Sequence, residues 1–444
     1  MTYREAVAYL ESLIDYERTP AGAAAARVWN LDRTRAMLRS VGDPHLALRC
    51  VHIAGTKGKG STAAMSASIL TAAGLRTGLY TSPHLVSFRE RIRVDGATIA
   101  PEEVVALVAE VRPVLESLDG SELGAPSFFE AYTLLGLLYF AQRHVDVAVI
   151  ETGLGGRLDA TNVITPLACA LTRIGRDHTL ELGSGLAEIA REKAGIIKQG
   201  ITVLSAPQER EALEVFQEVC LERHAQLIVV GEDPGPRVSV TQADRERQVL
   251  SIRGMRGTYD DLECPLLGEH QAENAVVAVG LVELLANHGI EVGFEAIRSG
   301  IKSVGWPGRF QIVSRRPYVI LDGAHDELGA GALAATLESV FPSRRILLVL
   351  GVGRDKELEP IVDRLCPLAD RVILTASSSP RALDAHELQR KVFHRCRHTA
   401  AYTPVSLALR EAIDQAKRHD IVVVTGSLYV VGEAMRALGL GEPE

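Results

Sequence analysis

Apolar residues recur along this chain in two alternating patterns, and the alternation predicts an α/β fold. In one pattern they stand three and four residues apart, as on one face of a helix; in the other they form short, nearly continuous runs, as in buried strands. Because such runs are typical of strands covered on both faces, we predict a mainly parallel sheet between layers of helices. Helices are predicted at 2–16, 31–40, 101–118 and 128–144, and strands from residue 50 and at 75–80, 145–150 and 167–172.

A second block of the same kind follows the Gly/Pro-rich stretch SVGWPG at 303–308. We place a domain boundary there, with one domain at 1–302, a linker at 303–308 and a smaller Rossmann-like domain at 309–444. Before the boundary, short alternating stretches at 248–267 predict a small antiparallel addition, and a helix follows at 270–287. In the second domain, strands are predicted at 319–322, 346–351, 371–375 and 421–425, with a helix at 330–341.

The stretch CVHIAGTKGKGSTAAMSASILT, which begins at residue 50, joins an apolar run to a run of helix formers through a glycine-rich turn. Glycines let backbone N–H groups surround an anion, Lys59 adds a positive charge, and the helix that follows points its positive dipole end at the same place. A strand, a phosphate loop and a helix are therefore predicted, with a nucleoside triphosphate as the ligand. We accordingly predict that the domain at 1–302 is a P-loop domain. The alternative is an ordinary strand-turn-helix corner, since Gly60 interrupts the strict G-x-x-x-x-G-K-[ST] pattern. The loop residues are Gly55, Thr56, Lys57, Gly58, Lys59, Gly60 and Ser61.

Polar residues follow three predicted strands at the sheet edge where ligands gather in α/β folds. Ser82 and Glu151 come at the ends of two of them, and Asp177-His178 follow the third. A hydroxyl, a carboxylate and an imidazole suit Mg²⁺, which takes few protein ligands and completes its octahedron with water and phosphate oxygens. Taken singly, each residue could instead cap a turn, end a strand or stand in a loop, so spacing alone leaves the metal site open.

Composition and charge narrow the class of protein. With 444 residues, 47% hydrophobic and 23% charged, the chain has the make-up of a soluble protein of two or more domains. No apolar run approaches the ~20 residues of a membrane helix, and the N-terminal stretch lacks the layout of a secretory signal, so we expect a cytoplasmic protein without a membrane partner. A net charge of −8 offers no basic surface for nucleic acid. We expect small-molecule partners and a monomer.

Six cysteines stand singly along the chain, at positions 50, 169, 220, 264, 366 and 396. The absence of a C-x-x-C pair argues against a zinc site and against a disulfide framework. We therefore expect reduced thiols, mostly buried.

A series of linked motifs resembles the folylpolyglutamate synthase and dihydrofolate synthase family, whose members are relatives of the Mur ligases. The motifs stand in the family's order and span nearly the whole chain: GTKGKGS, TSPHLVSFRERI, SFFEAYT, ETGLGGRLDATN, DHT, EKAGIIK, GEHQAENA, WPGRF, DGAH and TGSLYVVGEA. The resemblance implies a Mur-ligase-like P-loop domain and an ATP-dependent amide ligase. In such a ligase the γ-phosphate of ATP passes to a substrate carboxylate, and L-glutamate then displaces it from the acyl phosphate. The acceptor would be a folate, dihydropteroate or both.

The resemblance also implies roles for individual residues. Lys59, Lys193 and His178 would be catalytic; Ser82, Glu151, His178 and a carbamylated Lys193 would hold Mg²⁺; Asn274, Arg309 and Asp322 would bind ATP; Arg91, His325 and Ser427 would bind glutamate; and Asp159 would contact the folate. Spacing alone favours an ion pair for Lys193 with a neighbouring glutamate and a surface ion pair for Arg91. Phe128 could offer a ring face to a pterin, although phenylalanines that open a helix more often pack in a core.

One segment departs from the family. The family usually has DGAHNP where this chain has DGAHDE at 322–327, so that Asp326 and Glu327 replace a neutral pair. We favour a helix cap for Asp326 and a favourable dipole interaction for Glu327. Altered amino-acid specificity is the alternative.

Two other functions stay open, a Mur-like ligase for another acid or amino acid and a nucleotide-binding regulator without ligase activity. The intact Glu151, His178 and Lys193 argue against the regulator.

Overall fold

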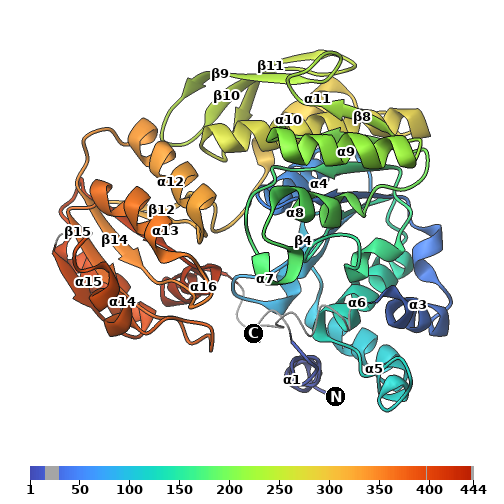
Figure 1. The fold of residues 1–444 in the computed structure, drawn as a ribbon, viewed down its shortest axis with the longest axis horizontal. Helices are drawn as coiled ribbons and strands as arrows, with labels where there is room; N and C mark the ends of the chain where they lie inside the picture. Colours follow the sequence, from blue (N-terminus) through green and yellow to red (C-terminus); the bar gives the residue numbers. More distant parts are fainter. Residues whose placement is uncertain (16–29, 397, 442–444) are drawn as a thin grey trace.

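The computed structural model describes residues 1–15, 30–396 and 398–441. Figure 1 shows two halves side by side: the half coloured blue to yellow contains an eight-stranded sheet, and the orange-to-red half contains a six-stranded sheet. The chain passes from one to the other after helix α11 (Phe294–Ser303), and β12 (Gln311–Arg315) is the first strand of the second sheet. The stretch 303–308 lies at this passage, and the domain limits drawn from it remain a prediction.

The larger sheet has the strand order β4-β3-β2-β5-β1-β6-β7-β8. Strands β2, β5, β1, β6, β7 and β8 pair in parallel, whereas β3 and β4 form an antiparallel edge. Every residue of the central strands β1 and β5 is buried, as expected for a sheet covered on both faces. The strands are β1 (Cys50–Ala54), β2 (Thr77–Tyr80), β3 (Ile92–Val94), β4 (Ala97–Thr98), β5 (Val147–Glu151), β6 (Ala168–Leu171), β7 (Thr202–Ser205) and β8 (Gln226–Val229).

Helices lie on both faces of this sheet. They are α1 (Tyr3–Glu11), α3 (Leu31–Ser40), α4 (Lys59–Ala72), α5 (Pro101–Leu118), α6 (Phe128–Gln142), α7 (Thr179–Leu182), α8 (Leu186–Ala194), α9 (Arg210–Glu222), α10 (Glu269–Leu284) and α11. Successive side chains of β1 point to opposite faces. Val51 and Ile53 therefore pack with α4, α10 and α11, while Cys50 packs with α6 and its neighbours. Single 3₁₀ turns are η1 (Pro44–Ala47), η2 (Phe88–Arg91), η3 (Ala160–Val163) and η4 (Leu285–His288).

The sequence predictions for this half agree closely with the structure. The helices predicted at 31–40 and 101–118 coincide with α3 and α5, and the one predicted at 128–144 is α6. The helix predicted at 2–16 ends at Glu11, and its predicted last residue lies outside the described part of the chain.

A small antiparallel sheet lies beyond the larger one, over α10 and α11 (Figure 1). Its strands are β9 (Arg237–Ala243), β10 (Gln248–Arg253) and β11 (Thr258–Cys264). Leu250, Ile252 and Leu262 join the hydrophobic core formed by these two helices. The predicted antiparallel addition is confirmed, with one more strand before residue 248 than the pattern indicated.

The second half is a doubly wound α/β sheet with the order β12-β13-β17-β14-β15-β16. All neighbours are parallel except the edge pair β12 and β13. Separate hydrophobic cores lie on its two faces. The remaining elements are β13 (Tyr318–Leu321), α12 (Glu327–Val340), β14 (Ile346–Leu350), α13 (Leu358–Leu365), η5 (Cys366–Leu368), β15 (Arg371–Leu374), α14 (Ala385–Val392), β16 (Thr399–Ala401), α15 (Val405–Gln415), β17 (Ile421–Thr425) and α16 (Leu428–Ala437).

The structure corrects the expectation that all six cysteines are reduced thiols. Cys366 and Cys396 form a disulfide, with their Cα atoms 5.2 Å apart. One lies just after α13 and the other just after α14, so the packing of two helical segments brings together residues 30 positions apart in the sequence. Spacing rules detect close pairs such as C-x-x-C and miss such a contact. The other four cysteines are buried and free, as expected.

A membrane-spanning helix was not expected from the sequence. In the described ranges, no helix combines the length and the apolar character needed to cross a bilayer.

Candidate functional site

A cavity of about 810 Å³ lies between the two halves of the molecule. From the first half it is lined by the glycine-rich loop before α4 and by residues that follow β2, β5 and β6; from the second half it is lined by residues that follow β13, β14 and β17. These are the carboxyl ends of parallel strands, where side chains and loops of an α/β fold can converge on a ligand. Segments from both halves of the chain therefore meet at one cavity.

The glycine-rich loop adopts a backbone that only small residues allow. Gly58 has a φ of 90° just before α4, and a Cβ there would lie 2.1 Å from the side-chain oxygen of Asn274. A Cβ on Gly60 would lie 2.9 Å from the indole of Trp306, which belongs to the stretch between the two halves. The loop is further fixed because the backbone N–H groups of Thr56 and Lys57 donate to the carbonyl oxygen of Arg173 at 3.0 and 3.1 Å. All seven predicted loop residues line the cavity.

Two lysines from different elements line the cavity. Lys59 opens α4, and Lys193 lies in the last turn of α8 with only 4% of its surface exposed. Within the described ranges neither ammonium group makes a hydrogen bond or an ion pair. Burial, helped by the charge of Lys59, lowers the pKa of Lys193 from 10.5 to about 7. The described residues do not form the ion pair that spacing alone favoured for Lys193: its helix neighbour Glu192 instead accepts from Arg157 at 2.8 Å.

The four predicted metal ligands Ser82, Glu151, His178 and Lys193 all line this cavity. Glu151 is 4% exposed, and burial raises the pKa of its carboxyl from 4.5 to about 7 despite the attraction of Lys59. One of its oxygens accepts from the backbone N–H of Ser82 at 3.2 Å, which brings those two residues together. Burial lowers the pKa of His178 to about 3, so its imidazole is neutral and keeps a lone pair for a ligand. A carboxylate, a hydroxyl and a neutral imidazole form a donor set that fits Mg²⁺.

Of the two predicted folate contacts, Asp159 and Phe128, only one lines the cavity. Asp159 lines the cavity and accepts from the backbone N–H groups of Leu154 at 2.8 Å and Thr161 at 3.0 Å. Phe128 is buried in the core and does not line the cavity, whereas its neighbour Phe129 does. Adjacent residues on a helix point about 100° apart, so only one of the pair can face the site. The ring that faces the cavity is therefore that of Phe129 and not that of Phe128, the residue we chose from the sequence.

Two of the three predicted glutamate contacts reach the cavity. His325 and Ser427 line it, but Arg91 does not. Arg91 is only 2% exposed; its guanidinium lies 5.2 Å above both the Phe128 and the Tyr132 rings, and its Nε donates to Nδ1 of His84 at 2.8 Å. The two aromatic faces direct this side chain into the core of the first half. Arg91 is thus neither the surface residue that spacing suggested nor part of the cavity wall.

The three predicted ATP contacts of the cavity wall come from both halves. Asn274 lies on α10, Arg309 precedes β12, and Asp322 follows β13. The carboxylate of Asp322 accepts from the backbone N–H groups of Phe310 at 2.7 Å and Ala324 at 2.9 Å. It therefore holds together the two segments that carry Arg309 and His325.

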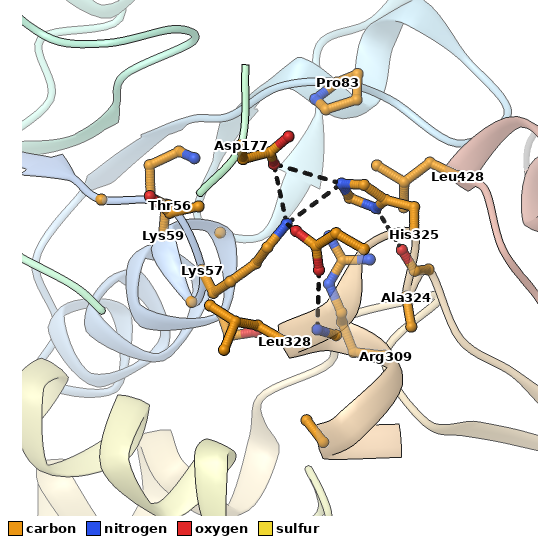
Figure 2. A pocket seen from close by; sticks show the side chains of 18 of the residues that line it. Thr56, Lys57, Lys59, Pro83, Asp177, Arg309, Ala324, His325, Leu328 and Leu428 are labelled. Atoms are coloured by element: carbon orange, nitrogen blue, oxygen red, sulfur yellow. Dashed lines mark hydrogen bonds and ion pairs between the residues drawn. The ribbon is translucent and has the colours of Figure 1, made fainter. Parts of the chain in front are cut away.

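A network of charges crosses the cavity between the two halves (Figure 2). Nζ of Lys57 lies 3.1 Å from Oδ2 of Asp177, forms an ion pair with Asp326, and lies 3.3 Å from Nε2 of His325. Lys356, which follows β14, donates to Oδ1 of Asp177 at 2.8 Å. Lys356 belongs to no motif that sequence reasoning singled out. Its position after a parallel strand was the available signal, because that is where cavity residues of this fold occur.

The predicted helix cap at Asp326 is confirmed. Its Oδ1 accepts from the backbone N–H of Gly329 at 2.9 Å, and α12 begins at the next residue. Its Oδ2 pairs with Lys57. The residue is therefore both a cap and part of the cavity wall.

Comparisons with known proteins show to which family this chain belongs. The model of the Mur ligase middle domain matches residues 53–282, and that of the Mur ligase, glutamate ligase domain matches 308–428. The dihydrofolate synthase/folylpolyglutamate synthase of Bacillus subtilis is 36% identical over 425 residues, covering 92% of this chain and 94% of that protein. This chain belongs to the folylpolyglutamate synthase and dihydrofolate synthase family. The resemblance drawn from the motifs and the predicted fold class are thereby confirmed.

Solved structures of folylpolyglutamate synthases show the same fold at full length. The Mycobacterium tuberculosis enzyme complexed with ADP is 34% identical, with a TM-score of 0.90 and coverage of 100% of this chain and 99% of that one. Escherichia coli FolC in complex with DHPP and ADP is 31% identical, with a TM-score of 0.86 and coverage of 99% and 98%. At this coverage, the likeness extends over both halves of the chain.

Proposed function

We propose that this protein joins L-glutamate to a folate, to dihydropteroate or to both, at the expense of ATP. The observation that carries the proposal is a single cavity in which a glycine-rich loop, a buried carboxylate and two lysines face the second half of a chain from this family; among the described residues neither lysine makes a hydrogen bond or an ion pair. The E. coli relative described in complex with DHPP and ADP supports a pterin-type acceptor and a nucleotide. These ligands come from different chemical classes, and a cavity of about 810 Å³ can hold more than one of them.

The reaction proceeds in two transfers. An oxygen of the acceptor carboxylate forms a bond to the γ-phosphorus of ATP, the bond to the β-phosphate bridge breaks, and ADP leaves. The amine nitrogen of glutamate then attacks the acyl carbon, phosphate departs with the bonding electrons, and the nitrogen loses a proton to give the amide. The protein contributes mainly by positioning and by offsetting charge: the loop N–H groups, Lys59 and Arg309 surround the phosphates, and the two halves exclude water.

Mg²⁺ would be held by Ser82, Glu151, His178 and a carbamylated Lys193, and when bound it would neutralise charge on the phosphate oxygens. Lys193 suits the modification because carbon dioxide adds only to a neutral amine, and the pKa of this buried amine is about 7. In forming the carbamate, Nζ bonds to the carbon of CO₂ and releases a proton. The product replaces a cation with an oxygen anion, which is a better ligand for a hard metal.

The test is phosphate release by the purified full chain with Mg²⁺ and ATP. We expect release only when L-glutamate and either dihydropteroate or tetrahydrofolate are both present, and mixtures that lack one component serve as controls. Comparing the two acceptors assigns the activity as dihydrofolate synthase, folylpolyglutamate synthase or both. Turnover with non-folate acids alone would contradict the proposal in favour of another Mur-type ligase. Nucleotide binding without turnover on any acceptor would favour the regulator.

A further inference from the structure

The ammonium group of Lys57 lies in a cradle formed by three acceptor atoms (Figure 2). We define the ammonium cradle as Oδ2 of Asp177, Nε2 of His325 and Oδ2 of Asp326, the last two from the second half of the molecule. The first two lie 3.1 and 3.3 Å from Nζ of Lys57, and the third forms an ion pair with it. An alkylammonium group has three N–H donors. The cradle therefore offers one acceptor for each of them.

Contacts other than those with Lys57 hold each acceptor in place. Oδ1 of Asp177 accepts from Lys356 at 2.8 Å, and Oδ1 of Asp326 caps α12. Nδ1 of His325 lies 2.7 Å from the carbonyl oxygen of Gly323. Because a carbonyl oxygen only accepts, Nδ1 carries the hydrogen and Nε2 presents its lone pair to the cradle. In each of the three residues, one polar atom makes a contact that fixes the side chain, and the other polar atom faces Nζ of Lys57. The side chains of the cradle are therefore held in place by contacts that do not involve Lys57.

Lys57 also belongs to the glycine-rich loop, where phosphate oxygens would compete for its charge. Its side chain lies on the wall of the same cavity as the loop N–H groups and Lys59. A triphosphate bound there would compete for the ammonium of Lys57 with Oδ2 of Asp177 and Oδ2 of Asp326, and among the described residues no other lysine pairs with these two oxygens. If Lys57 turned toward the phosphates, the cradle would keep its two negative charges and its imidazole lone pair, and a second ammonium group would have room to enter.

We propose that the ammonium cradle is the binding site for the α-ammonium group of the incoming amino acid, and that Lys57 fills it until phosphates draw this lysine to the loop. The inference rests on the proposed function, because it names how that ligase recognises its second substrate. It also gives Asp326 a role besides capping. The family's usual asparagine can cap the helix, but it offers no negative charge to an ammonium ion.

Steady-state kinetics of Asp326→Asn test the cradle directly. Asparagine caps helices as well as aspartate does, so the substitution removes the charge and keeps the cap. We expect the KM for L-glutamate to rise roughly 10-fold, the size expected for one lost charge-assisted hydrogen bond. The KM for ATP should not rise, because a competitor for Lys57 is weakened. Glu327→Gln is the matched control: it removes the adjacent carboxylate, which is 61% exposed and lies 3.9 Å from Arg364, and should change neither constant.

A measurement on the unaltered protein keeps the inference testable even if Asp326→Asn folds poorly. Methylammonium has three N–H donors, whereas tetramethylammonium has the same charge and none. At matched ionic strength, methylammonium should inhibit ligation competitively with L-glutamate, and tetramethylammonium should have no effect. Equal inhibition by both cations would show a general salt effect and overturn the inference.

The outcomes distinguish a failure of the proposed function from a failure of the cradle. If the unaltered protein ligates no amino acid to any folate acceptor, the proposed function fails and the cradle's role with it. If it is active but Asp326→Asn leaves the KM for L-glutamate unchanged and methylammonium does not compete, only the cradle is refuted.

The three cradle residues can bring their ligand atoms within 4.8 Å of one another, a spacing that a metal ion could also use. A change in Mg²⁺ dependence with an unchanged KM for L-glutamate would reassign the cradle to a metal and overturn the inference.

Discussion

Replacing Glu151 with glutamine should abolish activity and, in the absence of metal, make the protein more stable at pH 8. Glu151 ends β5 inside the cavity wall and is 4% exposed. Burial is the main reason why the pKa of its carboxyl rises from 4.5 to about 7. Glutamine has nearly the same shape and can still accept from the backbone N–H of Ser82, but it carries no charge to be buried. The cost of ionising this site is therefore removed while its packing is kept.

The size and sign of the effect follow from the shifted pKa. A rise from 4.5 to about 7, at roughly 1.4 kcal/mol per pH unit, sets a ceiling of about 3 kcal/mol. Because the folded state binds the proton more tightly, the contribution of Glu151 to stability is complete below pH 4.5, falls as the pH rises, and is lost above about pH 7. Glutamine avoids this loss. The gain stays below the ceiling because Lys59 loses the attraction of the Glu151 carboxylate.

The assay is the thermal midpoint of unfolding in EDTA at pH 5 and pH 8, with Glu327→Gln as an exposed control. We expect Glu151→Gln to exceed the unaltered protein by a few degrees at pH 8 and by less at pH 5, as a gain of this size implies. Glu327→Gln should show no pH-dependent difference. An equal or lower midpoint for Glu151→Gln at pH 8 would refute the reasoning about burial. Near-normal turnover of the variant with Mg²⁺ would show that Glu151 is not a metal ligand.

Three further changes have measurable outcomes. Lys193→Ala should lose both turnover and the carbon-13 carbamate signal that labelled bicarbonate gives with the unaltered protein, and a fully active variant would rule out this role. Thr161→Val removes a hydroxyl that donates to the Asp159 carboxylate at 2.5 Å and should raise the KM for the folate acceptor several-fold; an unchanged KM would separate Asp159 from folate binding. Unfolded protein should titrate four thiols before reduction and six after it, whereas six before reduction would contradict the Cys366–Cys396 disulfide.

The sequence predicts well wherever local chemistry decides the structure. The loop from Gly55 to Ser61 is one example, because glycines, lysines and a following helix specify a backbone shape within a few residues. The cap at Asp326 is another, since it needs only the backbone of its own first turn. Strand ends such as Glu151 are predictable for a different reason. Parallel strands bring their carboxyl ends to one edge of a sheet, so position along the chain translates into position at the site.

The sequence does not predict the direction of a side chain when that direction depends on neighbours that are distant in the sequence. A motif gives the position of Arg91 along the chain, but the rings of Phe128 and Tyr132 set its direction. The Cys366–Cys396 disulfide likewise depends on how two helical segments pack. The partnership of Lys57 with Asp326 requires the two halves to face each other across the cavity. No pattern in either segment encodes that arrangement.

The contact of Trp306 with Gly60 gives this protein a natural optical reporter. The indole belongs to the stretch that connects the two halves and lies against Gly60 of the glycine-rich loop. The guanidinium of Arg93 lies 5.6 Å from the centre of its ring. Fluorescence of an indole depends on the charges and polar groups around it, so phosphates at the loop or a shift of one half against the other will change its emission. The chain has only two tryptophans, and Trp29→Phe leaves Trp306 as the single emitter. Substrate binding can then be timed, one ligand after another, without attaching a dye to the enzyme.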